Sequence, residues 1–187
     1  MKYFIWTFDR QTNNSWFLGE PRTMTGQVID AWHFERCQFF ESDIQRLEVP
    51  IRQTGRKAAA SFGAFDLLYV NQKIAKAIMQ IVGNDVQLIP ISISSQIKEY
   101  SILNALREIN CIDEKRSSFT KWEEGNMSRP DKIGQYRSFT QLFVDPEKII
   151  DCHIFRPWGW RIRLIVSEHL KKEIEILGCD GTIFIPV

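Results

Sequence analysis

Apolar residues recur at helical spacing in a segment near the middle of the chain. The segment follows Asn71, a residue that favours the N-cap position of helices. Its aliphatic side chains fall three to four residues apart on one face: Ile74, Ile78 and Ile81 or Val82. The pattern stops at Gly83, and glycine commonly ends helices. These positions predict a helix between Asn71 and Gly83, followed by a mostly buried strand over Val86–Ile93.

A second segment repeats this arrangement near the carboxyl end. It begins at Ser167, carries apolar residues on one face (Leu170, Ile174, Leu177), stops at Gly178 and continues into a strand over residues 182–187. The two segments, 67–91 and 164–187, align at an offset of 95 to 96 residues and share an Ile-Pro-aliphatic ending. They indicate a strand-helix-strand unit present twice. The alternative is that any capped helix followed by a strand would look alike, since two copies are too few to define a repeat period.

The remaining pattern favours strands and loops. Residues 1–8, rich in Tyr, Phe, Ile and Trp, predict a strand, and the Asn, Gly and Pro residues that follow predict loops within a β-rich amino-terminal third. Residues 152–156 and 160–166 flank Pro157 and Gly159 and predict a hairpin. Asp145, with proline after it, predicts a helix start. Residues 100–109 fit a strand or a helix equally well.

A polar stretch over residues 113–139 carries Gly125, Pro130 and Gly134 and charges of both signs. It predicts a long exposed loop, and long loops in compact domains are more often functional than not. Together the patterns predict an α+β fold: a mixed sheet with two similar strand-helix-strand units and a β-rich amino-terminal part. The length of 187 residues suits a single domain, in which residues 1–62 form the β-rich part and 63–187 the core.

Composition narrows the partners. The net charge is +1, so nothing global steers the chain to nucleic acid or to an anionic membrane. Asp9 and Arg10 interrupt the first apolar run before it reaches the length of a signal-peptide core, and no other run could span a membrane. We expect a cytoplasmic protein. Its four spread cysteines are interpreted as buried thiols.

The sequence offers little support for catalysis or for cofactors. It contains no nucleophile elbow, P-loop or other glycine-rich phosphate cradle, and its three histidines lie in unrelated contexts. Cys152 and His153 are neighbours, which point to opposite faces of a strand. His33 and Cys37 could begin a zinc site, but no second pair of ligands has matching spacing. Paired glutamates are interpreted as solvated surface. We predict no enzymatic activity, no cofactor and no metal.

The segment FRPWGWRIR combines arginine with tryptophan around a predicted turn. Both protein-binding hot spots and nucleic-acid platforms use this combination. The alternative is that Trp158 and Trp160 cover the core while the arginines line a solvated strand. The balanced charge weakens the nucleic-acid interpretation more than the protein-binding one.

From about residue 65 to 187 the chain resembles a bacterial immunity-protein family of polymorphic toxin systems, immunity protein eleven. The resemblance lies in the ordered set FDLLYVNQKIAKAI, VQLIPI, YSILNALREINCID, EKRSSF, HIFR and LIVSEHLKKEIEILGCDGTIFIPV. It implies a cytoplasmic antidote that binds a cognate toxin delivered by contact-dependent or type VI secretion in interbacterial competition. The resemblance brings no catalytic residues, and the amino-terminal third matches least.

We therefore expect a toxin-binding protein with an aromatic and basic contact surface. The predicted contact residues are Arg156, Trp158, Trp160, Arg161, Lys121, Arg129 and Arg137. Two alternatives stay open. A nucleic-acid-binding module would use the arginine and tryptophan hairpin and would lose affinity steeply with salt. An enzyme with an unrecognised site would show a pocket with converging polar groups and perturbed titration.

Overall fold

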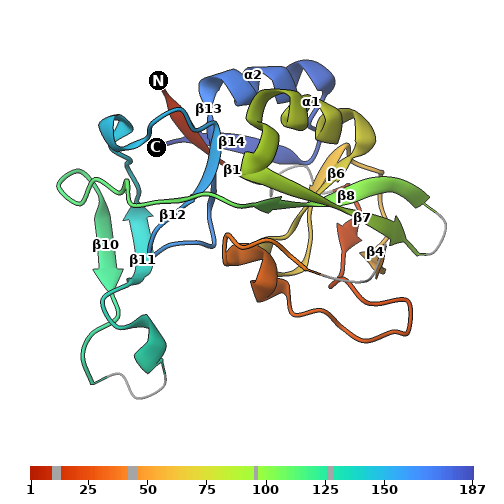
Figure 1. Ribbon diagram of the computed structural model, residues 1–187, viewed down its shortest axis with the longest axis horizontal. Coiled ribbons are helices and arrows are strands. Elements are labelled where there is room, and N and C mark those ends of the chain that lie inside the picture. Colours follow the sequence, from red (N-terminus) through yellow and green to blue (C-terminus); the bar gives the residue numbers. More distant parts are fainter. Residues whose placement is uncertain (10–13, 42–45, 95–96, 126–128) are drawn as a thin grey trace.

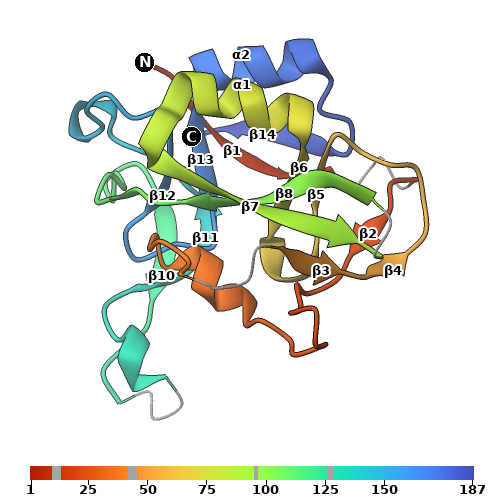
Figure 2. The same cartoon turned by 45° about the vertical axis from the view of Figure 1, so that its right-hand side comes forward.

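Two five-stranded sheets, covered on one side by two helices, form the body of the protein (Figures 1 and 2). The computed structural model describes residues 1–9, 14–41, 46–94, 97–125 and 129–187. Helices and strands are both present in mixed sheets, so the predicted α+β fold is confirmed. Neither helix in this part of the chain is long and apolar enough to cross a membrane.

The elements follow one another along the chain as follows. They are β1 (Tyr3–Phe8), β2 (Phe17–Leu18), η1 (Ala31–Glu35), β3 (Leu47–Val49), β4 (Ile51–Gln53), β5 (Ala60–Phe62), η2 (Ala64–Asp66), β6 (Leu68–Asn71), α1 (Gln72–Val82), η3 (Gly83–Asp85), β7 (Val86–Ile93), β8 (Ile97–Ala105), β9 (Glu108–Ile109), β10 (Ser118–Lys121), η4 (Pro130–Lys132), β11 (Tyr136–Gln141), η5 (Pro146–Lys148), β12 (Ile154–Pro157), β13 (Leu164–Ser167), α2 (Glu168–Leu177) and β14 (Thr182–Pro186). The η elements are 3-10 turns.

Both predicted helices are confirmed, with their caps. The Asn71 side chain accepts a hydrogen bond from the backbone N–H of Ile74 at 2.9 Å, and the Ser167 hydroxyl accepts one from Leu170 at 3.2 Å. Each bond satisfies a backbone donor that the first turn of a helix leaves free. The helices end where Gly83 and Gly178 take positive φ angles of 52° and 81°, which side chains resist.

The two strand-helix-strand units are a structural repeat. The first sheet has the order β3-β7-β8-β6-β5 and the second β14-β1-β13-β12-β9. In both, the two strands joined by the helix are parallel and are separated by one strand antiparallel to each: β8 lies between β6 and β7, and β1 lies between β13 and β14. The register also agrees, because Tyr100 pairs with Asn71 and Tyr3 pairs with Ser167. A chance likeness of two helices would not reproduce this pairing.

The repeats exchange their first strands. When the chain is divided between β7 and β8, each half begins with a strand that completes the sheet of the other half. The amino-terminal strand β1 fills the gap between β13 and β14, and Figure 1 shows it in red beside the blue strands of the carboxyl end. The strand β8 fills the gap between β6 and β7 in return. Neither half can therefore close its own sheet.

One core joins both halves beneath the helices. It gathers residues of α1 and α2, which pack on each other, with the inner faces of both sheets, and includes Trp6, Leu103, Ile74 and Ile174. Trp6 of β1 is its largest member; its indole N–H donates to the Thr182 hydroxyl at 2.9 Å. The shared core supports the prediction that residues 1–187 form a single domain, which stays a prediction.

Each sheet has a second face, and a different segment covers each one. Residues of the amino-terminal segment, including Trp16, Leu18 and Phe34, pack on the first sheet. The segment between β9 and β12 packs on the second sheet through Cys111, Val144 and other apolar side chains. This second segment also carries the antiparallel pair β10–β11, which projects from the body (Figure 1).

Several sequence predictions need correction. The predicted loop over residues 113–139 contains the strands β10 and β11, whose residues Phe119 and Phe139 pair across the strands. Gly125, Pro130 and Gly134 favour a loop in the local sequence, whereas the strands form by pairing of residues that lie further apart, such as Ser118 with Gln141. The helix expected after Asp145 is a single 3-10 turn. The open segment 100–109 is strand, in β8 and β9. The predicted hairpin is confirmed, but its second strand begins only at Leu164.

The exchange of strands predicts that replacing Trp6 destabilises the whole molecule. Trp6→Ala removes a buried indole that packs edge-on against Phe62 of the first sheet's half and stacks on Phe184 of the second. We expect a loss of about 3 to 5 kcal/mol in the free energy of unfolding, measured by urea denaturation. Trp158→Ala, at a tryptophan that is 45% exposed, serves as the control and should cost much less. Two separate unfolding transitions in the unsubstituted protein would contradict a single cooperative unit.

Candidate functional site

A cleft of about 540 Å³ opens where three separate parts of the chain meet. One side is η1 of the amino-terminal segment, the second is the β10–β11 pair with η4, and the third is the connection between β12 and β13. Figure 2 shows the ribbons of β10 and β11 beside the segment that holds η1. The lining side chains are mostly aromatic or charged: Trp32, Trp122, Tyr136, Trp160, Asp30, Glu35, Arg36, Arg129, Asp131, Lys132, Arg137 and Arg161.

The short helix η1 holds Trp32 at the cleft. The carboxylate of Asp30 accepts a hydrogen bond from the backbone N–H of Trp32 at 3.0 Å and caps the turn. Ala31 and Phe34 are buried in the core beneath the first sheet and anchor the turn from below. Trp32 points outward in consequence, and 41% of its surface is exposed.

The β10–β11 pair is fixed to the body by an aromatic contact. Phe139 packs on Trp160 with ring centroids 5.3 Å apart, and the backbone N–H of Tyr136 donates to the Gly159 carbonyl at 3.2 Å. A Cβ atom on Gly159 would lie 3.0 Å from the Tyr136 ring, so this close approach favours glycine. The Tyr136 hydroxyl donates to Glu114 at 2.6 Å. These contacts set the width of the cleft.

Basic side chains in the cleft are held by rings or by carboxylates. The Lys132 ammonium lies 5.4 Å from the centre of the Trp32 ring, and the Arg137 guanidinium lies 5.1 Å from that of Trp122. Arg129 makes two hydrogen bonds to Asp131, at 3.1 and 2.9 Å. Arg161 makes two to Glu108, at 2.6 and 2.9 Å. The cleft therefore presents ordered cations next to aromatic surface.

The structure brings together most of the residues that the sequence predicted as a contact surface. Four of the seven line the cleft: Arg129, Arg137, Trp160 and Arg161. Lys121 lies in an adjacent hollow with Arg137 and pairs with Glu114 at 2.7 Å. Trp158 is exposed on the β12–β13 connection but is not among the cleft-lining residues. The sequence did not predict Trp32 or Glu35, because only the tertiary fold brings η1 to this place.

Arg156 does not belong to that surface. It is 2% exposed, and its guanidinium donates from Nη1 to the Arg161 carbonyl at 2.6 Å, while its Nε has no partner among the described residues. Burial lowers the pKa of this arginine, and the charge of Glu35 opposes that effect. All four residues of β12 are buried, so this strand does not alternate between core and solvent. The sequence interpretation assumed an exposed strand face.

Glu35 is a buried acid that faces the cleft. It is 6% exposed, and burial raises its pKa to about 7, with the nearby Arg156 guanidinium acting in the opposite direction. A carboxyl with a pKa near neutral pH is typical of enzyme active sites, so it bears on the alternative that the protein is an enzyme. Among the described residues, no hydrogen bond joins the Glu35 carboxyl group to a nucleophile or a histidine; the Cys37 thiol donates only to the Glu35 backbone carbonyl, at 3.9 Å. The described residues also contain no group of three His, Cys, Asp or Glu side chains that is placed to hold a metal.

Within the described residues, no hydrogen bond joins a cysteine thiol to a histidine ring. Cys111 and Cys152 are buried, and burial raises their pKa values to about 12 and about 11. The Cys152 thiol donates to the Ile154 carbonyl at 3.2 Å, while His153 Nδ1 lies 2.8 Å from the Ser167 hydroxyl. Thiols with such pKa values stay protonated at neutral pH and are poor nucleophiles.

Burial of Glu35 predicts a pH-dependent stability. Its pKa is raised above the ordinary value of 4.5, so the folded state holds this proton more tightly than the unfolded state does. Stability should fall as the pH rises from about 4.5 to about 7, by roughly 3 kcal/mol, and then level off. Glu35→Gln, which resembles the protonated acid, should abolish this fall and be the more stable protein at pH 8. Urea denaturation at several pH values measures it.

The matched control is Glu147→Gln, at an exposed carboxylate. It should leave the pH dependence of the unsubstituted protein unchanged. An unaltered pH profile in Glu35→Gln would show that Glu35 is ionised in the folded protein at the same pH as in the unfolded one.

Comparison with known proteins identifies the family. A family model described as the Immunity protein family (Imm11) matches residues 89–187, more than half of the chain. The matched region holds β8, the β10–β11 pair, the β12–β13 connection and the whole second strand-helix-strand unit. A search of curated proteins finds no match. The family resemblance expected from the sequence is thus confirmed, and the chain belongs to the Imm11 immunity protein family.

Proposed function

We propose that this protein binds one cognate secreted toxin, neutralises it by covering a functional surface of that toxin, and performs no catalysis itself. Membership of an immunity family is the observation that carries the proposal. We place the toxin in a polymorphic or contact-dependent system of interbacterial competition, type VI secretion included, and the neutralisation in the cytoplasm. The cleft between η1, the β10–β11 pair and the β12–β13 connection is the proposed contact surface.

The chemistry of the cleft suits a protein partner. Tryptophan and arginine dominate the few residues that supply most of the affinity in protein interfaces. Here Trp32, Trp122 and Trp160 meet in one concave site with arginines beside them. Lys132 and Arg137 already rest on tryptophan rings, so less side-chain freedom is lost when a partner binds. Two of the five basic side chains of the lining pair with carboxylates, and the remaining three favour an acidic segment of the toxin.

The same geometry disfavours nucleic acid. A phosphate backbone requires several exposed, unpaired cations along a track. Arg161 and Arg129 are each occupied by a carboxylate, and Arg156 is buried. The hairpin that suggested nucleic-acid binding therefore offers few free charges.

Co-expression tests the proposal directly. The toxin encoded beside this gene is expressed with and without the protein, and survival of the host and co-purification of the two chains are scored. We expect survival and a stable one-to-one complex. Death of the host in the absence of any complex would contradict the proposal for that toxin.

Charge reversal at Arg137 tests the cleft as the contact surface. Arg137→Glu should weaken toxin binding at least about tenfold, because it removes a cation held over Trp122 and repels an acidic partner. The control, Lys76→Glu, makes the same reversal at an exposed position on α1. Isothermal titration calorimetry compares the two. Equal affinities of the two variants for the toxin would show that the toxin does not bind at the cleft.

Trp158 provides a separate test of the predicted turn. It is exposed close to the cleft, and Trp158→Ala should weaken binding by several-fold if the toxin extends over the β12–β13 connection. The free energy of unfolding of the variant, measured alongside, should stay nearly unchanged. Unchanged affinity would limit the contact to the cleft itself.

A further inference from the structure

The internal repeat allows one face of the two sheets to be compared residue by residue. In the first sheet, Ile102 of β8 pairs with Tyr69 on one side and Ile89 on the other. In the second, Ile5 of β1 pairs in the same way with Ile165 and Ile185. Ile89 and Ile185 are therefore equivalent positions in the two repeats, 96 residues apart.

The equivalent isoleucines have very different surroundings. Ile89 is 6% exposed, because Trp16, Leu18 and Phe34 of the amino-terminal segment pack over this face of the first sheet. Ile185 is 43% exposed. The segment that covers the second sheet reaches Tyr3 and Ile165, and in part Ile5, but leaves Ile185 of β14 exposed.

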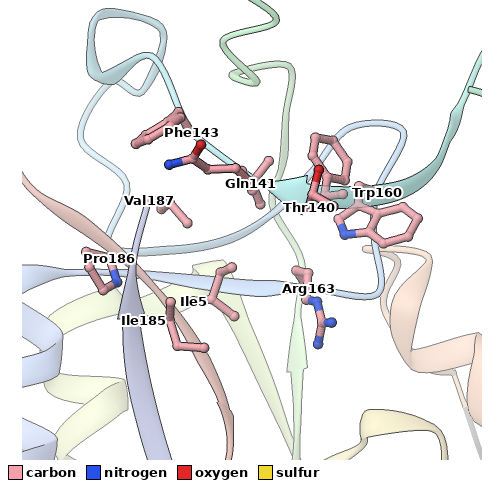
Figure 3. Close-up of a pocket in the computed structure, with 11 residues that line it drawn as sticks. Ile5, Thr140, Gln141, Phe143, Trp160, Arg163, Ile185, Pro186 and Val187 are labelled. Atoms are coloured by element: carbon pink, nitrogen blue, oxygen red, sulfur yellow. The ribbon is translucent and has the colours of Figure 1, made fainter. Parts of the chain in front are cut away.

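A groove of about 490 Å³ lies at Ile185 (Figure 3). In Figure 3, Phe143, Gln141 and Trp160 lie along one wall, while Ile5, Ile185 and Pro186 lie along the other. Arg163 lies near the Trp160 end, with its guanidinium 4.0 Å from Asp66. Most of the lining is apolar, and single exposed apolar residues are common whereas an apolar groove marks a binding site.

We infer that this groove is a second contact for the toxin and takes an aromatic or branched aliphatic side chain from a protruding segment. The inference rests on the proposed function. It adds a second contact site on the protein and the kind of toxin side chain that binds there. The first repeat supports this inference, because tryptophan, leucine and phenylalanine side chains of a loop-rich segment cover the equivalent face there. A partner that supplies the same chemistry completes the second repeat in the same way.

The groove and the cleft described above lie next to each other. Trp160 lines both of them, and Phe139, which lines the groove, packs on the Trp160 ring at 5.3 Å. One partner can therefore reach both sites. The cleft supplies ordered charges, and the groove supplies the apolar burial on which affinity chiefly depends.

A second copy of this chain fits the groove poorly. A symmetric dimer buries the same patch on both subunits, so the patch must be complementary to itself. Two concave grooves placed face to face leave both unfilled. The segment that closes the equivalent face is already buried in its own molecule. A partner of different sequence avoids both problems if it presents a convex apolar feature that fills the groove.

The test compares two isoleucines. Ile185→Lys places a charge in the groove, and Ile176→Lys makes the same change at a position of α2 that is 76% exposed. Binding of the toxin encoded beside this gene is measured for both variants by calorimetry, and their mass in solution by light scattering. We expect Ile185→Lys to bind at least about tenfold more weakly than the unsubstituted protein, and Ile176→Lys to bind within about threefold of it. Thermal denaturation of both variants establishes that they are folded.

Each outcome has a separate meaning. Tight binding by Ile185→Lys, with the unsubstituted protein also binding, overturns the groove while the proposed function stands. A dimer of the unsubstituted protein that Ile185→Lys dissociates would show that a second copy covers this face, and also overturns the inference. Failure of the unsubstituted protein to bind the toxin removes the proposed function and the inference together.

Discussion

The exchange of β1 and β8 between the two repeats is the constraint on which the rest of this structure depends. Each strand-helix-strand unit leaves a gap between its parallel strands, and only the first strand of the other half fills it. A sheet with an open gap would leave a row of backbone donors and acceptors without partners. The exchange removes that cost in both sheets at once. It also brings both helices over a common core, in which Trp6 touches residues of both halves.

The proposed contact surface lies in the segments that the two repeats do not share. Their helices and sheets are nearly equivalent, but different segments connect the first strand of each repeat to the next. The amino-terminal segment closes its sheet face and presents Trp32 outward. The segment between β9 and β12 closes its face in part and projects β10 and β11. The cleft lies where these two unrelated segments meet, and it is the contact surface that we propose for the toxin.

Two ionisable side chains of opposite charge, Arg156 and Glu35, are buried near the cleft. Arg156 supports the β12–β13 connection through the Arg161 carbonyl, and Glu35 lines the cleft with a pKa of about 7. Burying two ionisable groups without a direct ion pair between them destabilises a fold. Both groups lie at the walls of the cleft, so this loss of stability arises at the candidate site. The core consists of apolar side chains and does not carry it.

The sequence by itself determined the local elements and the family. Caps, stop glycines and aliphatic spacing gave both helices, the strands next to them and the repeat, because those signals act within about one helical turn. Four of the seven predicted contact residues line one cleft, and their role in binding stays a prediction. Only the tertiary structure decided which strands fill which gap, that Arg156 is buried, and that Trp32 and Glu35 join the cleft. Those outcomes depend on contacts between residues far apart in the chain, and no local pattern of hydrophobic and polar positions records them.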